Sequence, residues 1–286
     1  MSKERYKLFI YGSDKTLSQY DQIVTDLSHK YDLYINEINL QDGAKVIVLG
    51  GDGSLNYFVN NVNYSIDNSI LYLPCGTAND FAKSLGIEWK DQSSNFIESV
   101  LASCSTMTIS VALCNDRKFL NAAVGGALSE ITNSGDDLLK KLSGKLSYYV
   151  AAVDKVFSAK VIDFDLICKN EKQNVQSYGF IVSQGLFAGG GAKITTNVVP
   201  NFSDTLNFIS PFNAELVKSL EFALKLQNVE KIEFSNEDSE KLLNLFETEF
   251  LIRSDQELNV KLDGEVYKAH DLNFKKSDKK ITFYMY

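Results

Sequence analysis

The sequence predicts two domains of different class: an α/β domain with a doubly wound, mostly parallel sheet, followed by an antiparallel β-sandwich. In the first third of the chain, short apolar runs alternate with helical patterns, as in βαβ units. After residue 105 the expected strands are separated mainly by turns, which is typical of antiparallel β proteins. We place the domains at 1–108 and 109–279, and we expect the last strand, near 280–286, to return to the first domain.

The elements of the first domain follow from two kinds of apolar spacing. Short apolar runs predict strands at 7–11, 33–40, 46–49 and 70–73. The run at 46–49 is continuous and rich in β-branched residues, which is typical of a buried parallel strand. Apolar residues at helical spacing predict helices at 17–27, 55–62 and 77–85.

The second domain is predicted to be rich in short strands. We expect them at 107–113, 119–124, 161–168, 177–182, 206–209, 258–262, 272–274 and 281–284, with helices at 138–157 and 214–226. The segment 235–249 carries five acidic residues, and we expect a solvated helix or loop there.

Composition excludes several classes of function. The chain has 29 basic and 37 acidic residues, and this net charge of −8 argues against a nucleic-acid partner. It has no apolar run of about 20 residues and no signal-like start, so we expect a cytoplasmic protein. Two histidines exclude a histidine-rich metal site, and the four cysteines form no CxxC pair and are expected to be reduced. Any chemistry must therefore rest on carboxylates, backbone amides and a divalent ion.

A glycine-rich loop follows the expected strand at 46–49. It reads Gly50-Gly51-Asp52-Gly53-Ser54 and opens a helix, whose N-terminal amides favour phosphate oxygens. Asp52 would lie at the carboxyl end of a parallel strand, where α/β sheets bind ligands. A tight turn without any ligand explains the same residues, and the motif is neither a P-loop nor GxGxxG.

A second loop, at 74–82, follows the next strand in the same way. Thr77 is expected to be a helix N-cap, or to turn its hydroxyl toward a nucleotide. Asp80 in the first helical turn complements the helix dipole even without a function. Two such loops after successive strands, each with an aspartate, indicate a ligand site.

These two loops resemble the diacylglycerol kinase catalytic family, which includes bacterial soluble lipid kinases, sphingosine kinases and ceramide kinases. The residues that carry the resemblance are Gly50-Gly51-Asp52-Gly53-Ser54-Leu55-Asn56 and then Pro74-x-Gly76-Thr77-x-Asn79-Asp80-Phe81-Ala82. Further similar segments follow in the family's order at 119–126, 145–149, 185–191 and 258–265, the last ending in Asp263-Gly264-Glu265.

The resemblance implies an ATP-dependent lipid kinase, with diacylglycerol as the first substrate to consider. It implies that ATP is held by Gly50, Gly51, Asp52, Gly53, Ser54, Asn56, Gly76 and Thr77. It assigns Glu265 as the base that takes the hydroxyl proton, with Asp52 as the rival assignment. Asp80 would belong to the network around the catalytic Mg²⁺, which Asp52 and Asp80 would hold through water.

The sequence departs from the family at three places, one of which is the segment 235–249, longer than the family's usual connection. Where the family has Asn-Pro-x-Ser-Gly after its first strand, Gly12 and Ser13 would offer amides to phosphate, and Lys15 would offer charge. Where soluble bacterial members carry Asp-Asp-Gly near a structural magnesium, this chain keeps one carboxylate, Asp204. A second metal at Asp204 is therefore a weaker expectation than the first.

Two other functions compete with the lipid kinase. An NAD kinase has a related fold and shares Gly-Gly-Asp-Gly, and a non-catalytic lipid or nucleotide sensor would explain the departures. The expected partner is a lipid substrate at a membrane surface, with transient membrane contact because the sequence shows no anchor. A homodimer through the β-sandwich domains is also possible.

Overall fold

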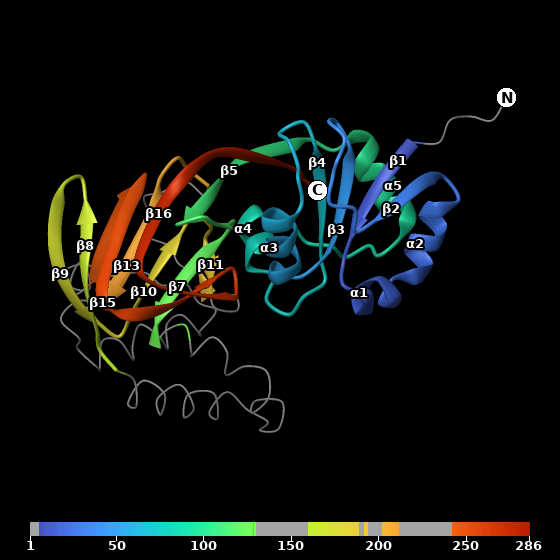
Figure 1. The fold of residues 1–286 in the computed structure, drawn as a ribbon. Coiled ribbons are helices and arrows are strands. Elements are labelled where there is room, and N and C mark those ends of the chain that lie inside the picture. Colours follow the sequence, from blue (N-terminus) through green and yellow to red (C-terminus); the bar gives the residue numbers. More distant parts are fainter. Residues whose placement is uncertain (1–5, 128, 130–159, 189–191, 194–201, 212–241) are drawn as a thin grey trace, which may run out of the picture. The chain divides into compact units, whose positions relative to one another are not determined.

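The computed structural model describes residues 6–127, 129, 160–188, 192–193, 202–211 and 242–286 (Figure 1). The chain divides into two compact units, one of Met1–Val111 with Ser277–Tyr286 and the other of Ala112–Lys276. The boundaries expected from the sequence, 108/109 and 279/280, lie beside 111/112 and 276/277.

The first unit contains a parallel sheet. Its strands are β1 (Tyr6–Tyr11), β2 (Tyr31–Ile35), β3 (Lys45–Gly50), β4 (Ser69–Pro74) and the end of β16 (Glu265–Tyr284). They lie in the order β16-β4-β3-β1-β2, and all four pairings are parallel. Because β2 lies on one side of β1 and β3 on the other, the strand order reverses between β1 and β3. This is the point at which open α/β sheets bind ligands.

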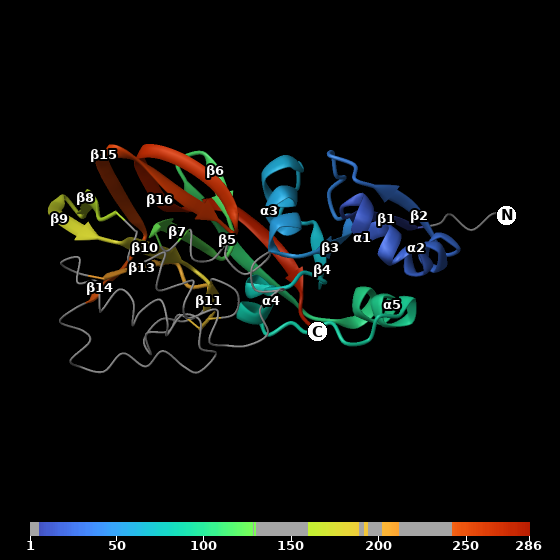
Figure 2. The same cartoon turned by 90° about the horizontal axis from the view of Figure 1, so that it is seen from below.

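Helices cover both faces of this sheet (Figures 1 and 2). On one face, α1 (Asp14–Gln19), α2 (Asp21–Ser28) and α5 (Ser94–Ser103) pack on alternate strand residues. On the other lie α3 (Asp52–Asn61) and α4 (Asp80–Leu85). There Tyr11 packs edge-on against Phe58, and the rings of Tyr72 and Phe81 lie 6.0 Å apart. The predicted doubly wound α/β fold is confirmed.

Several boundaries of the first unit differ from the sequence prediction. The helix expected at 17–27 is two helices that meet at Tyr20, whose φ of −116° is not helical. The strand expected at 33–40 ends at Ile35, because Asn36 has a φ of 54°. The α5 helix was not predicted, although Ser93 caps it by accepting a 3.1 Å hydrogen bond from the amide of Phe96.

The second unit is antiparallel, as predicted. Its strands are the end of β5 (Thr106–Cys114), β6 (Arg117–Phe119), β7 (Ala122–Gly126), β8 (Ile162–Cys168), β9 (Glu171–Ser177), β10 (Gly179–Ser183), β11 (Phe187–Ala188), β12 (Ala192–Lys193), β13 (Leu206–Pro211), β14 (Leu242–Glu247), β15 (Glu249–Leu262) and most of β16. Fully buried phenylalanines dominate its core, among them Phe164, Phe180, Phe208, Phe250 and Phe274.

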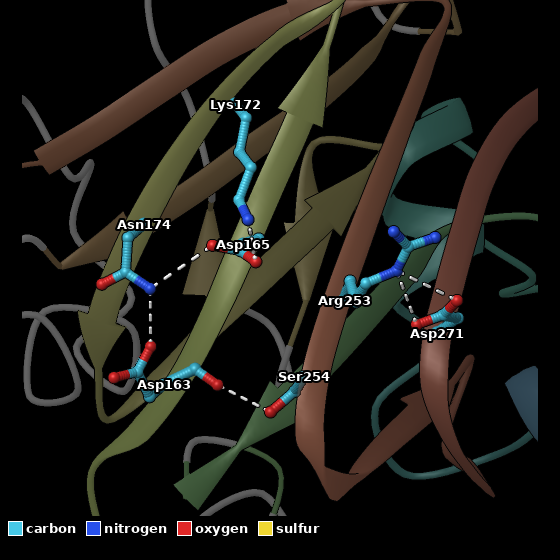
Figure 3. Close-up of polar contacts among 7 residues, drawn as sticks. All are labelled: Asp163, Asp165, Lys172, Asn174, Arg253, Ser254 and Asp271. Atoms are coloured by element: carbon cyan, nitrogen blue, oxygen red, sulfur yellow. Dashed lines mark hydrogen bonds and ion pairs between the residues drawn. The ribbon is translucent and has the colours of Figure 1, made fainter.

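The long strand β15 joins two groups of strands. Its first half pairs with β8 and its last residues pair with β7, and its register against β16 shifts between Arg253 and Leu258. At the shift, the Ser254 hydroxyl donates a 2.6 Å hydrogen bond to the Asp163 carbonyl of β8 (Figure 3). This bond ties β8 to the irregular point of β15.

Exposed polar pairs surround this point (Figure 3). The Lys172 ammonium lies 2.7 Å from the Asp165 carboxylate and lowers its pKa, and Arg253 lies 3.3 Å from Asp271 across β15 and β16. Because such surface pairs are screened by solvent, they contribute little to stability. We therefore interpret them as strand-to-strand contacts.

Several expectations for the second unit are wrong. The strand expected at 119–124 is the end of β6 and the start of β7 with a bend between them, and the strand expected at 177–182 is the end of β9 and most of β10. Residues 242–247 of the acidic segment form β14, because Leu243 and Leu245 pack against the phenylalanine core. The strands expected at 272–274 and 281–284 are parts of one strand, β16. The helices expected at 138–157 and 214–226 and the family-like segment 145–149 lie outside the described residues, as do 189–191 and 235–241. Among the described residues, no helix is long and apolar enough to cross a membrane.

Candidate active site

The structure brings the two predicted glycine loops into backbone contact. β3 and β4 pair in register from Lys45 to Gly50, and the Cys75 amide donates a 3.0 Å hydrogen bond to the Gly50 carbonyl. A Cβ added at Gly76 would lie 2.6 Å from the Cα of Gly51, closer than real side chains come. The contact therefore requires glycine at position 76, whereas a Cβ at Gly51 would be crowded at 3.1 Å from the Gly76 Cα.

Asp52 ties the first loop to the second. Its carboxylate accepts hydrogen bonds from the backbone amides of Asp80 and Phe81, at 2.9 and 3.0 Å. Burial raises the pKa of Asp52, and these two amide bonds oppose the rise because they stabilise the charged form. The carboxylate thus satisfies amides at the start of α4 from another loop, as a capping side chain would.

Asn79 shapes the second loop. Its Oδ1 accepts a 3.0 Å hydrogen bond from the Gly76 amide, and its Nδ2 donates a 2.8 Å bond to the Gly76 carbonyl. Asn79 has a φ of 50° and occupies the N-cap position of α4. The prediction of Thr77 as N-cap is therefore wrong, and Thr77 is exposed ahead of the helix.

The other residues expected to bind ATP lie in the first turns of α3. Gly53 and Ser54 are partly buried there, and Asn56 is buried and accepts from the Asn60 side-chain amide at 3.1 Å. The buried Asp80 begins α4. The hydrogen bonds from the Asp80 and Phe81 amides to Asp52 hold the two aspartates on adjoining loops. Their carboxylates are the oxygen ligands that Mg²⁺ prefers, so Asp52 and Asp80 fit a magnesium site that is bound through water.

Hydrogen bonds within the protein hold the loop after β1 in place. The Gly12 amide donates to Asn36 Oδ1, and Asn36 Nδ2 donates to the Gly12 carbonyl, both at 3.1 Å. The Ser13 hydroxyl caps α1 by accepting a 3.2 Å bond from the Thr16 amide. The Gly12 amide is thus already occupied, whereas Lys15 is exposed.

The expected base lies in the second unit, at the hairpin between β15 and β16. Leu262 pairs with Glu265, and the turn residues Asp263 and Gly264 have φ values of 50° and 100°. Asp263-Gly264 is thus a two-residue hairpin turn, for which Asp-Gly is a favoured pair. Glu265 is exposed, and Asp263 accepts three backbone amides from residues 120–122.

Among the described residues, Asp204 has no cluster of metal ligands around it, and the same holds for Asp52 and Asp80, for which only water-mediated binding is expected. Asp204 is exposed, and the described residues contain no group of three or more His, Cys, Asp or Glu arranged for a metal ion. Burial lowers the pKa of Lys276 to about 8, and the negative charge of Asp204 opposes this shift. Asp204 therefore already interacts with a cation of the protein. The Lys276 ammonium donates to the Gln184 side-chain carbonyl.

Residues 3–113 match the model of the diacylglycerol kinase catalytic domain. The resemblance to this kinase family is thereby confirmed. A Staphylococcus epidermidis protein named "Putative lipid kinase" is 26% identical over 234 residues, which cover 81% of this chain and 73% of that protein. The diacylglycerol kinase of Bacillus subtilis is 28% identical over 166 residues, or 55% of this chain and 52% of that enzyme. Residues 3–113 thus resemble a kinase catalytic domain, and these two relatives are named lipid kinase and diacylglycerol kinase.

Solved structures share the fold. A crystal structure titled "putative diacylglycerol kinase", from Bacillus anthracis, has a TM-score of 0.73 at 19% identity and covers 100% of this chain and 98% of its own. An NAD kinase from Archaeoglobus fulgidus, in complex with ATP, has a TM-score of 0.54 at 13% identity and covers 98% and 93%. At these identities the likeness concerns the fold alone.

Sequence reasoning missed the anchoring hydrogen bonds of three residues: Asn36, which it did not single out, and Asn79 and Asp263, which it named only as parts of motifs. Each has a positive φ, which asparagine and aspartate adopt more readily than most residues. An Asn or Asp at the end of an expected strand, or just before an expected helix, is the signal that would have found them.

Proposed function

We propose that this protein is an ATP-dependent lipid kinase that transfers the γ-phosphate of ATP to a lipid hydroxyl, with diacylglycerol as the first acceptor to test. The observation that carries the proposal is the backbone contact between the Gly51 and Gly76 loops, tied by Asp52 at the carboxyl ends of β3 and β4. Helix starts with closely approaching backbones suit phosphate groups. The names of the relatives support a lipid as the acceptor.

The residues divide into three roles. Gly50, Gly51, Gly53, Ser54 and Asn56, with Gly76 and Thr77, bind ATP. Lys15 adds charge, whereas Gly12 and Ser13 serve mainly to close their own loop. Asp80 and Asp52 orient the waters of Mg²⁺, which when bound offsets charge on the phosphates.

The transfer itself needs one proton acceptor. The lipid hydroxyl oxygen bonds to the γ-phosphorus, the bond from that phosphorus to the β–γ bridging oxygen breaks, and ADP leaves. The hydroxyl proton passes to the carboxylate of Glu265. Asp52 is the weaker candidate for the base, because both of its oxygens already accept backbone amides.

The test is transfer of labelled γ-phosphate from ATP, with Mg²⁺, to detergent-dispersed diacylglycerol, monoacylglycerol, sphingosine and ceramide, with NAD as a soluble acceptor. We expect a labelled lipid, and we expect Glu265→Gln to lower turnover by about 10²–10⁴-fold. Glu257→Gln, at another exposed glutamate of the same hairpin, is the matched control and keeps full activity. Labelled NADP without labelled lipid would favour an NAD kinase, and ATP binding without any product would favour a sensor.

The site of action is part of the same proposal. We expect the protein to work in the cytoplasm and to contact membranes transiently, because the acceptor lies in a bilayer. Flotation with diacylglycerol-containing vesicles, compared with vesicles lacking it, measures that contact, and light scattering of the pure protein tests for a homodimer.

A further inference from the structure

Asp263 connects the turn that carries Glu265 to a distant segment of the same unit. Its Oδ2 accepts a 2.6 Å hydrogen bond from the Leu120 amide, and its Oδ1 accepts bonds of 2.9 and 3.0 Å from the amides of Asn121 and Ala122. Its own amide donates a 2.9 Å bond to the Ala122 carbonyl. Four hydrogen bonds from one residue therefore join the hairpin turn to the bend between β6 and β7.

That bend is itself fixed from another side. The buried Gln184 donates through Nε2 to the Leu120 carbonyl at 2.6 Å and through its backbone amide to the Asn121 carbonyl at 3.0 Å. The Asn121 side chain donates to the Phe187 carbonyl at 2.6 Å. Asp263 thus attaches the hairpin to a segment with little freedom to move.

Glu265 depends on this attachment for its position. The side chain of Glu265 is exposed and forms no hydrogen bond or ion pair with the described residues. Its backbone follows a two-residue turn in which both residues have positive φ. Asp263, two residues before Glu265, holds this turn through the hydrogen bonds of its carboxylate.

We propose that Asp263 is a positioning residue that holds Glu265 where it takes the proton of the lipid hydroxyl, acting through the amides of residues 120–122. The inference rests on the proposed lipid kinase function and on Glu265 as its base. Catalytic groups misplaced by about 1 Å lose on the order of 10²-fold in rate, which sets the size of the expected effect.

The experiment compares Asp263→Ala, Asp263→Asn, Glu265→Gln and the double variant Asp263→Ala/Glu265→Gln, with Asp255→Asn as an exposed control on β15. Amide hydrogen exchange at residues 120–122 reports on the bonds independently of activity. Turnover and the KM for ATP are measured on the same samples, and circular dichroism checks that each variant is folded.

We expect Asp263→Ala to exchange faster at 120–122 and to lose about 10²-fold in kcat, with the KM for ATP unchanged. Asp263→Asn keeps an acceptor oxygen, so it should recover part of the slow exchange at 120–122 and part of kcat. The double variant should be no slower than Glu265→Gln, because a positioning residue has no effect once the base is absent.

Three outcomes overturn the inference, and they are distinguishable. Losses that multiply in the double variant, or full kcat in Asp263→Ala despite faster exchange, reject Asp263 while leaving the kinase intact. Full activity of Glu265→Gln rejects the base. Absence of any phosphoryl transfer by the wild-type protein rejects the proposed function itself.

Discussion

Asp52 and Asp263 use their carboxylates in the same way in the two units. Each accepts backbone amides from a separate loop, two for Asp52 and three for Asp263. A carboxylate that accepts amide bonds is stabilised in its charged form, and such bonds are stronger than neutral ones. At the scale of single residues, these side chains connect the loops on which other groups would act.

The bonds of Asp52 predict a stability effect. Asp52→Ala should lower the free energy of unfolding by about 2–4 kcal/mol, because the amides of Asp80 and Phe81 lose a charged acceptor. Asp52→Asn should lose less, since its amide oxygen still accepts. Urea unfolding measures both, with the exposed Asp42→Ala as control. Unchanged stability in Asp52→Ala would contradict the anchoring role and favour a purely chemical one.

Lys276 predicts how stability depends on pH. Burial lowers its pKa to about 8 in the folded protein, whereas an unfolded lysine titrates at about 10.4. Between these values the unfolded state binds more protons, so the contribution of Lys276 to stability rises as the pH rises. The unfolding free energy of wild type minus that of Lys276→Met should therefore increase from pH 7.5 to 10. The exposed Lys268→Met is the control, and a flat difference for Lys276→Met would contradict the lowered pKa.

At the scale of elements, the candidate site depends on how strands β3 and β4 end. The parallel pairing of Gly50 with Pro74 brings the next residues of both strands to one edge of the sheet. The two helices α3 and α4 then start there, so their N-terminal amides face the same region as the two loops. Local turn chemistry at Asn79 sets where α4 begins.

The contact between the loops predicts that Gly76→Ala is not tolerated. The new Cβ would lie 2.6 Å from the Gly51 Cα and 2.9 Å from Asn79 Oδ1, and backbone atoms cannot move aside cheaply. We expect a loss of about 1–3 kcal/mol in unfolding free energy and weaker ATP binding by calorimetry. Thr77→Ala, at the exposed neighbour, should leave stability unchanged. A Gly76→Ala protein with wild-type ATP affinity would show that the loop contact is unimportant for binding.

At the scale of the whole molecule, the first unit is discontinuous in sequence. It consists of Met1–Val111 and the last ten residues, Ser277–Tyr286. Ile281 and Phe283 are completely buried there, and the end of β16 pairs in parallel with β4. The first unit is therefore incomplete until residues 277–286 have been synthesised and have joined it.

Phe283 tests this organisation. Its ring lies 5.1 Å from that of Phe81 on α4, so Phe283→Ala should lower the free energy of unfolding by about 3–5 kcal/mol. Hydrogen exchange should also increase in β4, far from position 283 in sequence. Val266→Ala, at an exposed residue of the same strand, should change stability by less than about 0.5 kcal/mol. Exchange confined to the C-terminal residues would contradict a role of this segment in the first unit.

The fold class, most strands and both glycine loops could be predicted from the amino-acid sequence alone. Apolar periodicity and turn residues are local signals, so 46–49, 70–73 and Asp263-Gly264 were readable without a structure. The same local signals failed where one residue changed the backbone, as at Asn36, or where an acidic composition concealed Leu243 and Leu245.

Which groups come into contact became visible in the three-dimensional structure. Asp52 lies 28 residues from Asp80, and Asp263 lies 141 residues from Ala122, yet each pair is joined by a hydrogen bond. Such contacts depend on strand order and register, which decide which loops lie together. Neither of them produces a periodic pattern in the sequence. For that reason the sequence indicated the chemistry of the site, whereas the roles of Asn36, Asn79 and Asp263 as anchors became visible only in the folded protein.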